Sequence, residues 1–539
     1  MSASSKKKLR NEQQAVKLTE KQQAEQKEAK KLKLYTTAFV IVLVALLVVA
    51  VVFGVSNAIS GSGIRERKTI ALTVGENQIN NIEMNYYFID SLNKYLSGDN
   101  SYMTQLGLLD PTVPLDQQTN PLTGQNWGEY MLEYATQNAK ANYALADAAK
   151  AAGFVLREEY ATELNSLEDN MAFYAVLYGY EDADSYLKTL YGAGASLESY
   201  KQYTETSLLA QAYYNSYSEG LTYEDADLRA AEAENFNKYS SFTYNYYYMA
   251  ASKFLEGGTT DAEGNTTYSD EETAASIKAV EEAAKALVAE CTTVEELDAA
   301  ISALSINAES ATPVTSTLYE DTLYSNIANE SVANWLSESG RKEGDITCLP
   351  NNVNGEVSGY YVIYFQGVNE NTFALKNVRH ILAAFEGGTT DSTTGTVTYS
   401  DEEKAAAKAN AEEWLAQWKS GEATEDSFAA LANEKSADGD GTTGGLYEDI
   451  YPGLMIAPFE AWCYEDGRKA GDTGIVETTY GYHVMYFCGD SETNFRDLLI
   501  TDELMTTDLN SWYASLLENI VVTPGDTSYV DTGIVLSAG

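Results

Sequence analysis

The chain has 539 residues, of which 44% are hydrophobic and 21% are charged, so it is too apolar to be wholly disordered and long enough for several packed domains. It carries 35 basic and 80 acidic residues, a net charge of −45. This charge excludes nucleic acid as the expected partner, because binding to phosphates needs a basic surface. The four Cys residues form no CxxC pair, which argues against a disulfide scaffold and a zinc ribbon.

The first part of the chain has the features of a membrane anchor. Residues 1–33 hold ten Lys or Arg and four Glu, and residues 38–55 are eighteen apolar residues in succession. Eighteen residues make about 27 Å of helix, close to the hydrocarbon thickness of a bilayer. The positive-inside rule then predicts a cytoplasmic tail at 1–33 and a transmembrane helix at 34–57, with the remainder outside the cell. The alternative is a signal peptide cleaved near Ser56-Asn57-Ala58.

A helical region is expected next. Residues 70–87 indicate a short strand, a Gly-centred turn and the start of a helix. Apolar residues then recur at three- and four-residue spacing up to Gly153, which predicts an amphipathic helix that ends at a Gly cap; they are Leu132, Ala135, Ala139, Tyr143, Ala146 and Ala149. The 40 Tyr residues offer large amphipathic contact areas, which suit promiscuous peptide binding.

An internal repeat determines the predicted architecture. Residues 254–272 and 385–403 share a Gly-Gly-Thr-Thr segment and end in Ser-Asp-Glu-Glu, a capping box that starts an Ala-rich helix. Further matches follow in the same order in both copies, with LYED at 318–321 and 446–449, and GYYVIYFQG at 359–367 against GYHVMYFCG at 481–489. Each copy reads strand, loop, helices and terminal strand, so we predict an α+β fold with two tandem modules.

The second copy also contains four short patterns in a fixed order. These are VRHIL at 378–382, Gly-Gly-Leu at 444–446, Met455 with Phe459 four residues on, and YGYH at 480–483. Taken together over residues 377–490, they resemble a parvulin-type (PpiC) peptidyl-prolyl isomerase domain. The resemblance implies that His380 and His483 are paired active-site imidazoles with Asp438 as an acidic partner. It also implies an apolar pocket for the proline ring, formed by Leu446, Met455 and Phe459, and a polar neighbour of the histidines, Thr478.

These residue types suit the rotation of an X-Pro bond. The barrier of about 18–20 kcal/mol comes from amide resonance, so no bond needs to break. A catalyst needs an apolar slot, a desolvated carbonyl and a few oriented hydrogen-bonding groups. A structural role is the alternative for each residue: a strand His is often a core residue, Met455 and Phe459 are spaced as core residues, and Asp438 lies in a turn-like sequence. A metal site formed by the two histidines and Asp438 is a further alternative, although no metal-binding spacing is present.

The first copy lacks these side chains. Tyr361 takes the place of His483, and Met249 or Ala250 that of His380. Met455 and Phe459 are replaced by Ala328 and Val332, and the Gly pair by Ser316-Thr317. We therefore expect a noncatalytic module that binds unfolded chain or acts as a spacer.

The helical region resembles the amino-terminal chaperone domain of extracytoplasmic foldases of the PrsA and SurA type. Together, these segments predict a membrane-anchored isomerase and foldase that needs no cofactor or metal. Its expected partners are the membrane and unfolded exported polypeptides with X-Pro bonds. We also consider a homodimer. The alternatives are a noncatalytic tethered holdase and a structural surface protein. The predicted parts are a basic tail (1–33), a transmembrane helix (34–57), a helical chaperone-like domain (58–240), a degenerate module (241–370), an isomerase module (371–490) and a C-terminal helix and tail that pack on the helical domain (491–539).

Overall fold

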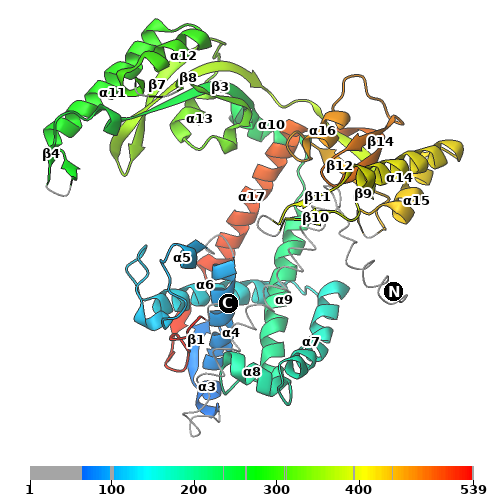
Figure 1. The fold of residues 1–539 in the computed structure, drawn as a ribbon. Helices are drawn as coiled ribbons and strands as arrows, with labels where there is room; N and C mark the ends of the chain where they lie inside the picture. The colour runs from blue at the N-terminus through cyan, green and yellow to red at the C-terminus, as the bar shows by residue number, and fades with distance from the viewer. Residues whose placement is uncertain are drawn as a thin grey trace. The chain divides into compact units, whose positions relative to one another are not determined.

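The computed structural model describes residues 63–536 apart from 98–101, 235, 262–263, 309, 311, 392–394 and 440. The predicted cytoplasmic tail and transmembrane helix lie outside the described residues. Within the described part, no helix combines the length and the apolar character needed to cross a bilayer. The described chain mixes helices with antiparallel sheets (Figure 1), which confirms the predicted α+β class.

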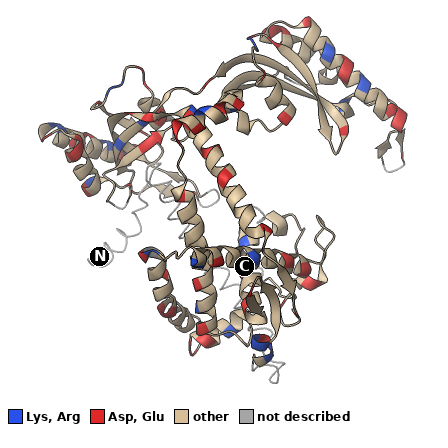
Figure 2. Ribbon diagram, turned by 180° about the vertical axis from the view of Figure 1, so that it is seen from behind, with Lys and Arg blue, Asp and Glu red and all other residues tan. Residues whose placement is uncertain are grey.

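The chain divides into two compact units. One comprises residues 63–222, 438–439 and 505–536, and the other comprises residues 223–437 and 441–504. Acidic residues are spread over the helices of both units, and Lys and Arg are much sparser (Figure 2).

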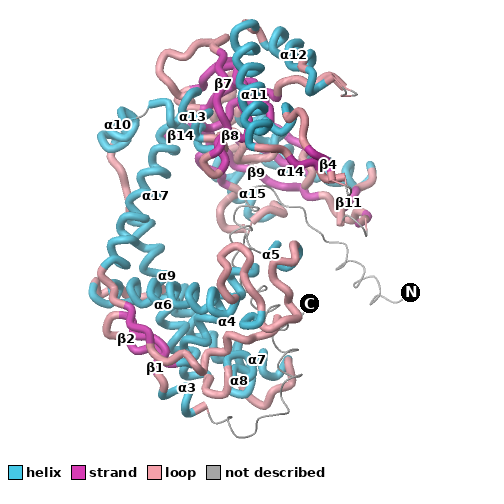
Figure 3. Tube along the Cα trace, turned by 90° about the vertical axis from the view of Figure 1, so that its left-hand side faces the viewer, coloured by secondary structure: helices cyan, strands magenta, loops and turns pink. Residues whose placement is uncertain are grey.

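The first unit is mainly helical, with one small sheet beside its helices (Figure 3). The helix predicted to end near Gly153 is α6, whose first turn is capped by the Asn126 side chain and whose end is followed by Gly153 at φ 66°. The elements are α3 (Ile64–Lys68), β1 (Ile70–Val74), β2 (Asn77–Asn80), α4 (Asn81–Ser97), α5 (Tyr102–Gln105), η1 (Leu115–Gln117), α6 (Trp127–Ala151), α7 (Glu158–Leu177), α8 (Ala183–Tyr191) and α9 (Leu197–Gly220).

Aromatic residues dominate the core of this unit. Tyr86 is fully buried, and its ring lies edge-on to those of Tyr191 and Tyr200 at 4.8 and 5.2 Å. The C-terminal segment adds to the same unit, because Trp512 of α17 (Phe495–Glu518) stacks on Tyr217 at 3.8 Å. Strand β15 (Val522–Pro524) pairs antiparallel with β1, so the tail completes a three-stranded sheet.

The second unit contains two four-stranded antiparallel sheets with the same strand order. The first sheet runs β6-β3-β8-β7, and the second runs β12-β9-β14-β13. Their strands, taken in chain order, are β3 (Ser241–Ala250), β6 (Thr317–Leu323), β7 (Ile346–Val353) and β8 (Glu356–Asn369), then β9 (Ala374–Ala384), β12 (Leu446–Ile450), β13 (Thr473–Glu477) and β14 (Gly481–Asn494). In each sheet the first and last strands of the repeat unit pair at the centre.

The helices of the two repeats also correspond in order. After the first strand comes a small hairpin, β4 and β5 at 259–260 and 266–267 or β10 and β11 at 389–390 and 397–398. The long helices α11 and α14 then start at capping boxes on Ser269 and Ser400, as the sequence predicts. The helices are α10 (Asp225–Glu234), α11 (Asp270–Glu290), α12 (Val294–Ala303), α13 (Glu330–Leu336), α14 (Asp401–Ser420), α15 (Glu425–Lys435) and α16 (Ala457–Cys463).

The second sheet buries both of its faces. Helices α14 and α15 cover one face, on which Ile381, Ala383 and Val484 are buried. The other face carries Val378 and Met485 and packs against α16 and the segment before it. Because successive side chains of a strand point to opposite faces, alternate residues of β9 face the two cores. The predicted histidines lie on the α16 side.

A buried arginine links the parts of this unit. Arg496, at the start of α17, is 1% exposed and donates to Glu232 of α10 at 2.5 Å and to the Glu370 carbonyl at 2.9 Å. Its guanidinium also lies over the Phe236 ring at 3.7 Å. A buried charge needs this degree of pairing, because an unpaired one costs several kcal/mol. Arg496 therefore joins α10, α17 and the link between the sheets.

Candidate active site

The two histidines come together on the central strands of the second sheet. His380 lies on β9 opposite Met485, and His483 lies on the neighbouring strand β14 opposite Leu382. Directly paired residues of antiparallel strands share a face, so both imidazoles point to the α16 side. Their ring centroids are 5.4 Å apart, with the ring planes at 44°. The structure therefore brings the two predicted site residues His380 and His483 together.

Thr478 fixes one of the two rings. Its Oγ1 lies 2.8 Å from His483 Nε2, and the same oxygen accepts the Tyr480 N–H at 3.1 Å. Burial lowers the pKa of His483 from 6.5 to about 3, because the charged imidazolium would lose its hydration. The His483 ring is therefore neutral across the physiological pH range and cannot act as an acid there.

Aromatic rings enclose the imidazoles. Phe459 of α16 lies edge-on to both histidines, with ring centroids 5.5 Å from each. The Tyr447 ring lies 5.1 Å from that of His380. Met455 belongs to the same apolar cluster as Phe459 and Tyr447. Two of the predicted apolar pocket residues thus lie with the histidines, in a core built by β9, β12, β14 and α16.

Leu446 is the exception and corrects the sequence-based assignment. It lies on β12 opposite Arg379, so its side chain shares the face of Arg379 and points away from His380. Tyr447, the next residue, pairs with Val378 and faces the site instead. A one-residue difference in register exchanges the faces of a strand, and the sequence did not reveal which residue of the pair points inward.

Gly445 allows β12 to approach His380. Gly445 has a φ of 64° and the preceding Gly444 a φ of 63°, both in the left-handed region that favours glycine. The His380 N–H donates to the Gly445 carbonyl at 2.9 Å, and a Cβ on Gly445 would lie 2.2 Å from the His380 oxygen. The Gly pair recognised in the sequence is therefore a close-contact requirement of the strand that carries His380.

Asp438 lies in the turn after α15. The Ala437 N–H donates to the Leu382 carbonyl at 3.0 Å, and Ser436 Oγ accepts the Leu382 N–H at 3.0 Å, so the chain just before Asp438 is bonded to β9. Asp438 is itself buried, with 7% of its surface exposed. Its catalytic assignment stays a prediction.

The site residues are almost fully covered. His380, His483 and Phe459 are 1%, 0% and 0% exposed, and Met455 and Thr478 are each 7% exposed. Leu454, next to Met455, is by contrast 40% exposed and presents apolar surface at the outer side of this region. Tyr447 and Leu454 were not predicted from the sequence. Tyr447 follows the Gly-Gly-Leu pattern, but only the strand register distinguishes it from Leu446.

The described residues give no metal-binding arrangement. No group of three or more His, Cys, Asp or Glu side chains in the described part is placed to hold a metal ion. All four cysteines are free thiols, and burial raises the pKa of Cys463 and Cys488 to about 12 each.

The first sheet places a tyrosine pair where the second has histidines. In the second sheet, His483 lies opposite Leu382 and His380 lies opposite Met485. In the first sheet, the corresponding pairs are Tyr361 with Tyr248 and Tyr246 with Ile363. Tyr246, not Met249 or Ala250, is therefore the counterpart of His380. The ring centroids of Tyr246 and Tyr361 are 5.1 Å apart, close to the separation of the imidazoles.

Comparison with protein families identifies the region that contains the two histidines. Residues 380–488 match the family model described as Rotamase, a PPIC-type PPIase domain. The match begins at one histidine and includes the other, Phe459 and Thr478 between them. This region is a PPIC-type peptidyl-prolyl isomerase domain.

Curated relatives agree with the domain assignment. The chain is 38% identical over 86 residues to Foldase protein PrsA 1 of Listeria innocua, a match that covers 16% of this chain and 28% of the relative. It is 37% identical over 113 residues to Foldase protein PrsA 1 of Listeria monocytogenes serotype 4b, covering 19% of this chain and 37% of the relative. The chain thus spans about a third of the length of these relatives.

Solved structures of the same name also match. The peptidylprolyl isomerase PrsA from Bacillus cereus is 18% identical, with 52% of this chain and 97% of that chain covered at a TM-score of 0.20. PrsA from Bacillus anthracis is 19% identical, with 28% and 59% covered at a TM-score of 0.17.

Proposed function

We propose that this protein is a peptidyl-prolyl cis–trans isomerase and foldase that assists the folding of exported proteins. The observation that carries the proposal is the convergence of the chain's two histidines with Phe459 and Thr478 inside the PPIC-type domain. The curated relatives are named foldases, and the matched region of this chain is the isomerase domain.

The proposed mechanism is noncovalent. An X-Pro amide loses resonance as it twists, so the catalyst has to bind the twisted form better than the planar one. Met455 and Phe459 supply an apolar wall for the pyrrolidine ring, and desolvation there favours the less polar twisted amide. His380 and Asp438 are the proposed catalytic residues. His483, neutral and bonded to Thr478, acts as a positioning residue that holds the His380 and Phe459 rings in place.

The cellular setting is part of the proposal. The basic segment and the apolar segment at the start of the chain support a single-pass anchor with the bulk of the protein outside the cell. In this setting the helical unit binds unfolded exported polypeptides, and the isomerase domain acts on their X-Pro bonds.

The first sheet has a noncatalytic role in this proposal. Tyr246 and Tyr361 replace the imidazoles, and Val332 and Ala328 replace the two large apolar side chains. A tyrosine pair offers a flat aromatic contact surface but no imidazole, so we expect this module to bind or space client chain without isomerising it.

A holdase without isomerase activity is the second candidate. It is favoured by one observation, the near-complete burial of His380, Phe459 and Met455. If the covering side chains do not move aside for a proline ring, the domain serves only as a folded support for client binding.

The two candidates are separated by a protease-coupled isomerisation assay on the full chain with a short X-Pro peptide. Under the proposal the wild-type chain accelerates cis-to-trans conversion, and Met455→Ala and His380→Ala each lower this rate at least tenfold. Tyr246→Phe in the first module is the matched control and leaves the rate unchanged. A wild-type chain that does not accelerate conversion would favour the holdase.

A further inference from the structure

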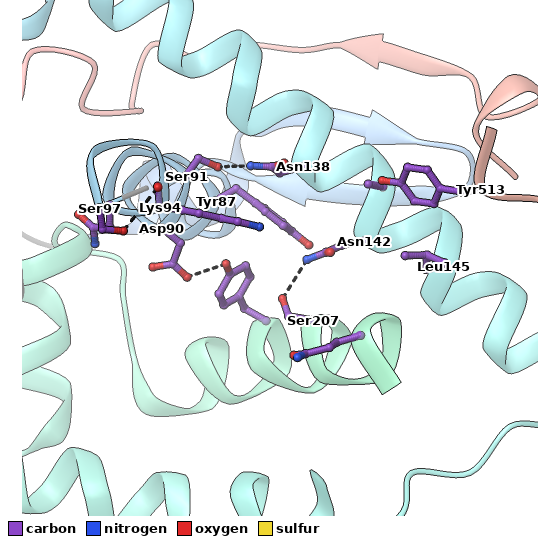
Figure 4. A pocket seen from close by; sticks show the side chains of 14 residues that line it. Tyr87, Asp90, Ser91, Lys94, Ser97, Asn138, Asn142, Leu145, Ser207 and Tyr513 are labelled. Atoms are coloured by element: carbon purple, nitrogen blue, oxygen red, sulfur yellow. Dashed lines mark hydrogen bonds between the residues drawn. The ribbon is translucent and has the colours of Figure 1, made fainter. Parts of the chain in front are cut away.

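The helical unit contains a pocket that the isomerase domain does not use. It has a volume of about 700 Å³ and is lined by residues of α4, α6 and α9, with Tyr513 of α17 at one side (Figure 4). This volume lies within the usual range of ligand-binding pockets. Its lining is rich in amides and hydroxyls, with Leu145 and Ala141 as the apolar part.

Several polar groups of the lining are already paired with one another. Asn138 donates to Ser91 at 2.7 Å and Asn142 donates to Ser207 at 3.0 Å, as Figure 4 shows. The Tyr87 hydroxyl interacts with the same Asn142 and Ser207 side chains. The Asn93 amide nitrogen, also in the lining, is buried and has no hydrogen-bond partner in the described part of the chain. Leaving a buried polar group without a partner is unfavourable, so this amide nitrogen indicates space for a ligand that completes its bonding.

Asp90 supplies the negative charge of the pocket. Its carboxylate accepts the Tyr203 hydroxyl at 2.7 Å and the Tyr191 hydroxyl at 3.4 Å. No described Lys, Arg or His forms an ion pair with it, although Lys94 lies one helical turn further along α4. Burial raises the pKa of Asp90 to about 6, against the opposing effect of the two tyrosine hydrogen bonds. At neutral pH the group is therefore a carboxylate without a cationic partner, an arrangement that favours a bound cation.

The other titratable groups around Asp90 do not offset its negative charge. Burial raises the pKa of Tyr87, Tyr191 and Tyr203, so all three are neutral. Glu83, one turn before Tyr87 on α4, accepts the Tyr143 hydroxyl at 2.5 Å, and burial raises its pKa. Lys94 is exposed at the rim, where water screens its charge.

We propose that this pocket binds the cationic side chain of a lysine or arginine in a client polypeptide, with Asp90 as its counter-ion. The apolar stem of such a side chain fits beside Leu145 and Ala141, and the Asn93 amide can bond the neighbouring main chain. The inference rests on the proposed foldase function for the identity of the ligand as a polypeptide. It adds a preference for basic segments that the isomerase site does not explain.

Fluorescence anisotropy with two matched peptides tests the inference. The probe is an unstructured labelled peptide of Gly, Ser and Ala with one central lysine, and its partner carries Nε-acetyl-lysine instead. Acetylation removes the positive charge at nearly the same size. With the full wild-type chain we expect acetylation to weaken binding about tenfold, because the peptide then loses its charge-assisted hydrogen bond to the Asp90 carboxylate.

The variants locate the effect. Asp90→Asn keeps an acceptor for Tyr203 and removes the charge, so the discrimination between the two peptides should disappear. Asp169→Asn on α7 is the matched control, since it removes one exposed acidic charge from the same unit and should preserve the discrimination. Equal discrimination in all three proteins would show that the net charge of the chain attracts lysine, and would overturn the inference.

The pH dependence of the wild-type chain gives a second measurement that needs no variant. Asp90 is charged above its raised pKa and neutral below it, so affinity for the lysine peptide should fall as pH drops from 7.5 to 5, while the acetylated peptide shows little change. A lysine affinity that is the same at both pH values would contradict the inference. Both measurements read binding alone, so an inactive isomerase site would leave their outcome unaffected.

Discussion

At the residue scale, the chain has two histidines, and the fold places both in one buried cluster. Their scarcity made them easy to single out, and their motifs gave their partnership with Phe459 and Thr478. The burial of the rings and the loss of charge on His483 could not be read from the sequence, because they depend on how α16 covers the sheet. These two features are the basis for the proposal that His483 is a positioning residue and not an acid.

The titration of the two rings tests this account. Because the pKa of His483 is lowered to about 3, its imidazole signals in a two-dimensional NMR spectrum should not shift between pH 8 and 5. His380→Gln assigns the remaining ring by elimination. A His483 signal that titrates near pH 6.5 would contradict the described burial.

The same shift makes a prediction for stability. The unfolded chain binds a proton on His483 below pH 6.5 and the folded chain does not until about pH 3, so stability is complete above pH 6.5 and falls as pH drops through this window. The loss for this group approaches about 1.4 kcal/mol per pH unit. It appears as faster hydrogen exchange in β14 at pH 5 than at pH 7, after correction for the intrinsic exchange rate. His483→Gln should remove the additional effect.

The Thr478 hydroxyl gives a second prediction at this scale. Thr478→Val removes the bond to His483 Nε2 and leaves a buried nitrogen without its partner, a cost of about 1–3 kcal/mol. Hydrogen exchange of peptides from 473–488 should therefore become faster, and Thr478→Ser should restore slow exchange. Equal protection in Thr478→Val and wild type would mean that the hydroxyl does not hold the ring.

At the scale of elements, the repeat predicted two units of strand, loop, helices and terminal strand, and the two sheets of the structure have a common strand order. The detailed register was not accessible. Counting back from the capping boxes aligns His380 with Met249, but 23 residues separate Tyr246 from Ser269 and 20 separate His380 from Ser400. The first copy has three additional residues between strand and helix, so a count along the chain shifts the counterpart by three positions. Only the pairing of β3 with β8 identifies Tyr246.

The Gly pair before β12 gives a prediction for this element. Gly445→Ala places a Cβ 2.2 Å from the His380 oxygen in addition to the cost of a positive φ, so β12 should detach from β9 and isomerase activity should be lost. Gly453→Ala is the control, with a φ of 89° and open space around the new Cβ, and should cost about 1–2 kcal/mol. Circular dichroism melting curves and hydrogen exchange in 374–384 compare the two. Equal effects would show that the close approach is unimportant.

At the scale of the whole molecule, composition excluded nucleic acid and the repeat gave the order of parts, but the contribution of the C-terminal segment to the helical unit needed the structure. Trp512 and β15 come from the last described part of the chain and belong to the same unit as residues 63–222. Such pairing between distant segments leaves no local pattern, whereas the capping boxes and the active-site motifs do.

Because the chain divides into two units, we predict that one substitution can lower isomerase activity without lowering the suppression of client aggregation. Met455→Ala should lower the isomerisation rate and leave suppression of client aggregation by the full chain unchanged, because Met455 lies in the unit that holds the isomerase domain. Light scattering of an aggregating client, with the isomerase assay run in parallel, measures both. Parallel loss in a folded variant would show that one site performs both tasks.

Exchange spectroscopy by NMR on a single X-Pro peptide tests the central claim most directly, because it observes the cis and trans signals without a coupled protease. Uncatalysed exchange takes tens to hundreds of seconds and gives no cross-peaks within a mixing time of about a second. We predict that a small amount of the full wild-type chain produces cross-peaks between the two forms and that Met455→Ala reduces them. Absence of cross-peaks with the folded wild-type chain would contradict the assignment of an isomerase.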